Sequence, residues 1–393
     1  MINKKILSVV IIAVLIGGGV AIGLSIAFWP REVEEGNLFL LPPGGEQVPE
    51  NAFISVWNTS KPGLSNDDEV NLPLEEIGEY NFTVNWGDGI KHTITKWNQS
   101  EVNHTYTSER VYTIIITGKI IGWRFNNRGD KDKLLEIKQW GDLRLGNSGD
   151  YFEGCSNLKI TATDILNLTR ITTLSRAFRD CSTLDTVPSM NNWDVSSVTD
   201  MHSMFRGADN FNQAIGDWNV SSVTDMTWMF YGATSFNQAI GDWTVSSVYD
   251  MELMFWNATS FNQAIGDWDV SSVHYMDSMF YDAAAFNQSI GDWDVSSVID
   301  MNWTFYGATN FNQNLSSWVV SNVGDMNGMF NGSALSTENY DSLLIGWSNL
   351  TSLQSHVTLG VGDVQYSSEA QDAHDYLTGI TYNWIIKDGG LSA

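Results

Sequence analysis

The stretch Phe261–Phe280, FNQAIGDWDVSSVHYMDSMF, decides the fold because the chain repeats it almost unchanged. Tryptophan, valine, methionine and phenylalanine each recur every 25 residues at a fixed position of this stretch. The four columns are Trp193, Trp218, Trp243, Trp268, Trp293 and Trp318; Val195, Val220, Val245, Val270, Val295 and Val320; Met201, Met226, Met251, Met276, Met301 and Met326; and Phe205, Phe230, Phe255, Phe280, Phe305 and Phe330. Copies at one fixed period predict a solenoid, in which each copy forms one coil and packs on the next.

Each copy predicts a coil made of a strand, a corner, a short helical turn and a second corner. In a strand at Asp267–Val270, Trp268 and Val270 face the core, while Asp267 and Asp269 face solvent. Met276, Met279 and Phe280 have the i, i+3, i+4 spacing of one helix face. The expected fold class is therefore a mixed α/β repeat solenoid with short parallel strands and short helical turns.

Three segments of different composition precede the solenoid. Residues 1–29 carry an apolar run after two lysines, which predicts one transmembrane helix with the body outside the cell, or a signal segment cleaved near Ser25–Ala27. Residues 30–49 are rich in Pro and Gly and predict a linker. Residues 50–133 contain β-rich segments and a Gly87–Gly89 turn that predict a small β-sandwich. The solenoid spans residues 134–334, and residues 335–393 cap its open end.

The charge pattern excludes some partners. The formal net charge is -26, and between Arg179 and Lys387 the only basic residue is Arg206. Such a surface repels phosphate backbones, so no nucleic-acid partner is expected. No catalytic, zinc or phosphate-loop motif occurs, which indicates that the chain is not an enzyme and needs no cofactor, calcium excepted.

Two parts of the chain resemble known families. VNWGDG at Val84–Gly89, HTY at His104–Tyr106 and VYTIIITG at Val111–Gly118 resemble the PKD-type immunoglobulin-like domain, although Val111 replaces its usual Gly. That resemblance implies an extracellular spacer.

The 25-residue copies are similar to the leucine-rich repeats of BspA-type surface proteins. Two earlier Phe-x-x-Cys-x-x-Leu copies, at Tyr151–Ile160 and Arg176–Pro188, fit the same family, with Tyr151 where Ala is expected. The endings Leu335–Asn349 and Tyr382–Gly390 fit it as well. This resemblance implies a leucine-rich-repeat-like cell-surface protein, often adhesive, with no catalytic residues.

Two sets of surface residues are candidate binding sites. The first set would bind Ca²⁺ through stacked carboxylates, or would form a solvated acidic face; it comprises Asp217, Asp242, Asp267, Asp269, Asp292 and Asp294. The second set would present aromatic rings to a glycan or protein, or would only stack on itself; it comprises Trp228, Tyr231, Trp256, Tyr281, Trp303 and Tyr306.

Covalent features are also predicted. Cys155 and Cys181 occupy equivalent places in consecutive coils, so they form either a disulfide or two buried thiols. Asn-x-Ser/Thr sequons predict glycosylation outside the cell, at Asn81, Asn98, Asn103 and Asn257.

Together these features predict a non-catalytic, membrane-anchored or secreted protein of the cell surface, whose solenoid binds an extracellular protein or glycan. The alternative is a structural component of a cell-surface layer, stabilised by calcium.

Overall fold

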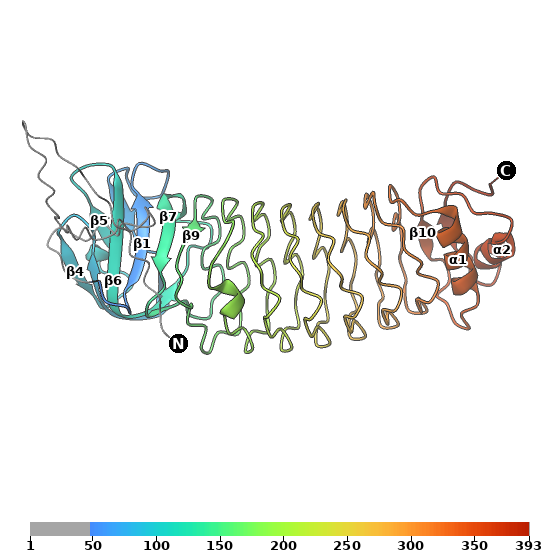
Figure 1. Cartoon of the computed structure of the whole chain (residues 1–393), viewed down its shortest axis with the longest axis horizontal. Coiled ribbons are helices and arrows are strands. Elements are labelled where there is room, and N and C mark those ends of the chain that lie inside the picture. Colours follow the sequence, from blue (N-terminus) through green and yellow to red (C-terminus); the bar gives the residue numbers. More distant parts are fainter. Residues whose placement is uncertain (1–47, 393) are drawn as a thin grey trace, which may run out of the picture.

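The computed structural model describes residues 48–392 of the chain. Figure 1 shows an elongated molecule with a β-sheet module at one end, a stack of coils in the middle and a small helical cap at the other end. The predicted transmembrane helix lies outside the described residues. Within residues 48–392, no helix is long and apolar enough to cross a membrane.

The N-terminal module consists of one large sheet and one small sheet. The large sheet has seven strands in the order β4-β3-β6-β1-β7-β9, with β8 paired to β6, and β2 pairs with β5 separately. Their bounds are β1 Phe53–Asn58, β2 Glu69–Asn71, β3 Leu74–Asn85, β4 Lys91–Ile94, β5 Asn103–Thr105, β6 Val111–Trp123, β7 Leu134–Gln139, β8 Leu143–Arg144 and β9 Lys159–Ile160. Short 3₁₀ turns lie at η1 Ser100–Val102, η2 Lys131–Lys133 and η3 Met190–Asn192.

The predicted hairpin is confirmed, and the sandwich is not. Strands β3 and β4 pair antiparallel around the Gly87–Gly89 turn, and Gly87 and Gly89 have φ of +84° and +94°. However, residues 50–133 do not form two sheets of similar size, because the large sheet takes up most of their strands. It continues directly into the solenoid: β7 pairs with β1, and β9 pairs in parallel with β7. The module and the first coil therefore share one sheet.

The predicted mixed α/β class of the coils is wrong. Within the described chain the two α-helices, α1 Thr337–Ser348 and α2 Gln371–Thr378, lie in the cap, and no coil contains one. The segment Met276–Phe280 cannot be helical because Ser278, in its middle, has φ +54°. Strands are also missing at Asp267–Val270; consecutive coils meet instead through single parallel bridges such as Asp225↔Asp250 and Asp250↔Tyr275.

A ladder of backbone hydrogen bonds joins the coils: four rows run one way, and a fifth row runs the other way, from the N–H of residue 249 to the carbonyl of residue 224. The N–H groups of residues 226, 228, 230 and 232 donate to the carbonyl oxygens of residues 250, 252, 254 and 256, at 2.7–3.2 Å. The same offset recurs in the neighbouring coils, and each donor of these four rows lies in the earlier coil. Two left-handed residues, four positions apart, recur in this segment, for example Trp228 at φ +61° and Gly232 at φ +70°.

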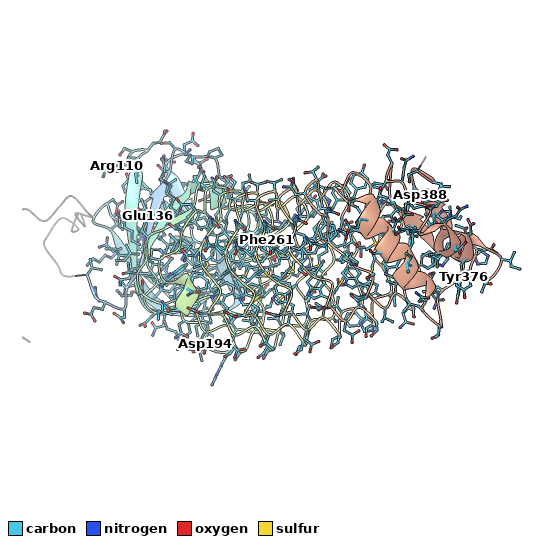
Figure 2. All side chains as sticks on the ribbon, turned by 45° about the vertical axis from the view of Figure 1, so that its right-hand side comes forward. Arg110, Glu136, Asp194, Phe261, Tyr376 and Asp388 are labelled. Carbon is cyan, nitrogen blue, oxygen red and sulfur yellow. The ribbon has the colours of Figure 1, made fainter. Side chains whose placement is uncertain are left out.

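The predicted core columns are confirmed. All residues of the Trp, Val, Met and Phe columns are buried. Phe255 and Phe280 stack with ring centres 5.6 Å apart, and Trp268 and Trp293 with centres 6.4 Å apart and planes 2° from parallel. The indole N–H of Trp268 donates to the carbonyl of Ile240 at 3.1 Å. Figure 2 shows Phe261 inside this stack and Asp194 at its periphery.

Asparagines form a second ladder, at the surface of the solenoid. Asn262 Oδ1 accepts from the backbone N–H of Asn287 at 3.0 Å and from Gln288 Nε2 at 2.9 Å, and equivalent bonds join the neighbouring coils. The ladder lies at the surface, since Asn237 and Asn287 are exposed.

Replacing Asn262 by Ala is expected to lower the free energy of unfolding by about 1–2 kcal/mol, because the N–H of Asn287 loses its acceptor. Urea unfolding followed by tryptophan fluorescence measures this change. Asp267→Ala, at an exposed position of the next corner, is the control and should change the midpoint little.

The cap covers the end of the core in the way that a further coil would. Trp347 of α1 is fully buried and donates its indole N–H to the carbonyl of Leu315 at 3.2 Å, as the coil tryptophans do. Strands β10 Thr358–Gly360 and β11 Ile385–Lys387 pair in parallel beside the last coil. The phenol of Tyr340 donates to Asp388 at 2.6 Å and ties α1 to the chain end.

Candidate ligand-binding face

One face of the solenoid differs from coil to coil while the rest is nearly constant. The corners Gly-Asp, Ser-Ser and Asn-Gln recur in most copies, as does the core. Most outward positions of the ladder segments vary, although the bridge position is Asp in five of six coils, and we call these outward positions the variable face. They belong to residues 199–206, 224–231, 249–256, 274–281, 299–306 and 324–331. At one such position the successive residues are His202, Thr227, Glu252, Asp277, Asn302 and Asn327.

The aromatic row lies on this face and forms one continuous stack. Ring centres are 4.2 Å apart for Tyr231–Trp256, 5.4 Å for Trp256–Tyr281 and 4.6 Å for Tyr281–Tyr306. All four rings are half-buried. The structure therefore brings the predicted row together, but the rings cover one another and present mainly their edges to solvent.

The two predicted tryptophans flank the row and differ in exposure. Trp228 stacks on Tyr231 with centres 5.3 Å apart. Trp303 is 42% exposed and lies over Gly328. Arg206 occupies the N-terminal end of the row, where its guanidinium carbon lies 4.8 Å from the centre of the Trp228 ring and 4.9 Å from that of Tyr231. A guanidinium thus already binds to this face through its rings.

A column of aspartates runs beside the row, at the bridge position of every coil from residue 200 to residue 325 except the one with Tyr275. In each case the carboxylate accepts from the backbone N–H two residues later, at 2.8–2.9 Å; the members are Asp200, Asp225, Asp250, Asp300 and Asp325. Sequence reasoning missed this column. The contrast between constant and varying positions of the copies would have revealed it.

In the middle coils, burial and neighbouring negative charges raise the pKa values of the acids on this face. Burial, followed by the charges of Glu252, Asp300 and Asp250, raises the pKa of Asp277 to about 7. Burial also raises the pKa values of Asp250, Glu252 and Asp300. Carboxylates here repel one another, and they are less solvated than those at the corners.

We expect Asp277→Asn to raise the melting temperature at pH 8 by more than at pH 5. The protonated carboxyl of Asp277 stabilises the fold below its ordinary pKa of 3.8, and that stability is lost as the pH rises through about 7. The amide imitates the protonated form at every pH. Thermal unfolding at both pH values measures the difference. Equal shifts at the two pH values would contradict it, and Asp267→Asn, at an exposed corner, should show no such trend.

Among residues 48–392, no group of three or more His, Cys, Asp or Glu side chains could hold a metal ion, so calcium binding by the predicted residues stays a prediction. Asp269 and Asp294 accept from the backbone N–H groups of Ser271 and Ser296 at 3.1 and 3.0 Å, so they act as turn residues. Asp217 bonds to Asn191. The remaining members of the set are exposed at the corners: Asp242, Asp267 and Asp292.

The other predicted residues lie away from the variable face. Cys155 and Cys181 are free and buried, and burial raises the pKa of both thiols. The asparagines Asn81, Asn98 and Asn103 are exposed in the N-terminal module. Asn257, by contrast, is half-buried in the ladder and has φ +54°. A pocket between the last coil and the cap, lined by residues that include Gly332, Ser336 and Asp363, contains no aromatic side chain.

Comparison with known proteins gives a family. The family model described as "Mycoplasma protein of unknown function, DUF285" matches residues 147–258 and 237–343, which together make up half of the chain. The chain belongs to this family. DUF285 is the family of BspA-like surface repeat proteins, so the resemblance drawn from the repeats is confirmed at that level. Residues 50–133 lie outside the match, so the PKD-like module stays a prediction. No curated protein and no solved structure matches the chain.

Proposed function

We propose that this DUF285 protein is a non-catalytic protein of the cell surface whose solenoid presents the variable face to a ligand outside the cell. The observation that carries the proposal is the division of each coil into constant and varying positions. The core and the corners keep the same residues from coil to coil, whereas the outward positions of the ladder carry Trp, Tyr, His, Arg, Asp and Glu. A rigid scaffold with one varied face is typical of repeat proteins that bind partners.

The surroundings of the solenoid support a role outside the cell. The apolar run in residues 1–29 follows Lys4 and Lys5, which favours a body outside the membrane. The sheet module would then hold the solenoid away from the membrane, since the coils extend from its edge.

Two measurements test this proposal. Protease treatment of intact cells should cut the protein, whereas an internal protein would stay intact. The purified chain should then be screened against extracellular proteins and glycans. Ordered self-assembly without binding to any other molecule would favour the alternative, a structural component of a surface layer. Cleavage only after cell lysis would overturn both.

A further inference from the structure

The acids of the variable face have no lysine or arginine of their own coils to pair with. Residues 207–386 contain neither Lys nor Arg. The face nevertheless carries a row of carboxylates in consecutive coils: Asp225, Asp250, Glu252, Asp277, Asp300 and Asp325. Burial and mutual repulsion raise the energy of the ionised forms at the centre of this row. A positively charged ligand would lower the energy of these ionised carboxylates, because it would offset both their burial and their mutual repulsion.

The geometry of the rings limits the class of ligand. Sugars bind aromatic residues by lying flat on ring faces, and here Tyr231, Trp256, Tyr281 and Tyr306 cover one another's faces. Trp303 is the most exposed ring of the set. Beside it, the buried Oδ1 of Asn302 has no hydrogen-bond partner within the described part of the chain. The face thus offers carboxylates, an amide acceptor and an indole to a hydrogen-bond donor.

The chain shows how such a donor is held at both ends of this face. Arg206 stacks its guanidinium on Trp228 and Tyr231 at the N-terminal end. At the C-terminal end, the ammonium group of Lys387 in β11 donates a hydrogen bond to Oδ1 of Asn327 at 3.0 Å. The coils between these two residues carry rings, carboxylates and the amide of Asn302, but neither Lys nor Arg.

We propose that the middle of the variable face binds a basic, arginine-containing segment of another protein. The inference rests on the proposed function and names the class of its ligand. A guanidinium suits the face because it pairs with carboxylates and also stacks against aromatic rings. A single metal ion suits it less, since the carboxylates are distributed along the axis and do not converge on one point in the described coils.

A peptide titration with charge-matched variants tests the proposal. The probe is a fluorescent 16-residue peptide of alternating Arg and Ser, added to the full chain at physiological ionic strength. The test variant is Glu252→Gln with Asp277→Asn, and the control is Asp242→Asn with Asp267→Asn, at exposed corners. Both pairs remove two negative charges. Anisotropy should show binding at least about tenfold weaker for the test variant, and within about twofold of the parent for the control.

Two further measurements make the result specific. Trp303→Ala should weaken binding of the Arg peptide more than that of the matching Lys peptide, because only the guanidinium stacks strongly. Acrylamide quenching of tryptophan fluorescence should fall when the peptide covers Trp303. Melting curves identify any variant that fails to fold. In that case the quenching measurement still tests the inference, because it uses the parent protein alone.

Several results would overturn the inference. Equal weakening in both charge-matched variants would show general attraction to an acidic protein. No binding of the Arg peptide by the parent would also overturn it. Neither result touches the proposed function, which fails only if the protein is absent from the cell surface or its variable face binds nothing in the screen.

Discussion

Trp268→Ala is expected to lower the free energy of unfolding by about 3–5 kcal/mol. Trp268 is buried in the middle of the solenoid, stacks with the indole of Trp293 and donates to the carbonyl of Ile240. Truncation leaves a cavity shared by neighbouring coils and removes one of the two donors to the carbonyl of Ile240, which keeps the N–H of Trp243. Urea unfolding followed by circular dichroism measures the loss.

Two variants separate the contributions at this position. Trp268→Phe keeps most of the volume but removes the N–H donor, so a smaller loss of about 1–2 kcal/mol is expected. Asp267→Ala changes the adjacent exposed side chain and should have little effect. If Trp268→Ala cost no more than Asp267→Ala, the indole column would not hold the coils together.

Asp130→Ala is expected to destabilise the N-terminal module by about 3–5 kcal/mol, because it leaves Lys133 buried without its carboxylate. Both side chains are fully buried, with Lys133 Nζ 4.0 Å from Asp130 Oδ1. Asp130 also accepts from the backbone N–H groups of Ser65 and Asn71 at 3.0 and 2.8 Å. These bonds fix the loop before β2, and hydrogen exchange of residues 63–71 would report their loss.

The matched control for this pair is the double variant Asp130→Ala, Lys133→Met. It removes both charges and keeps an apolar chain in the lysine position, so part of the stability should return. A double variant less stable than Asp130→Ala would show that Lys133 stabilises the module through its own bonds to the carbonyls of Asn66 and Glu69.

The core could be predicted from the sequence because burial depends on apolar residues at a fixed period. The Trp268, Val270, Met276 and Phe280 columns are all inward, as their spacing indicates. The hairpin at Gly87–Gly89 was predictable for a local reason, since glycine accepts positive φ.

The backbone of the coils could not be predicted in the same way. The i, i+3, i+4 spacing of Met276, Met279 and Phe280 suits a helix, but Ser278 and Asp282 adopt left-handed conformations. Nothing about a serine or an aspartate predicts this alone, because the conformation is imposed by hydrogen bonds to the next coil. The candidate site was missed in part for the same reason: Asp250 and Asp277 come together only across coils.

The four one-way rows of the ladder also give the rod an electrical polarity. Each peptide of these rows carries a dipole of about 3.5 D, and its carbonyl points toward the sheet module while its N–H points toward the cap. Four such rows add along the axis and the fifth row, through residues 224, 249 and 274, opposes them, so the negative pole lies at the N-terminal end. Arginines gather at that pole, where Arg124 and Arg176 contact Asp150 and Arg179 contacts Glu153. An elongated molecule of this kind would tend to orient in the electric field of a charged surface.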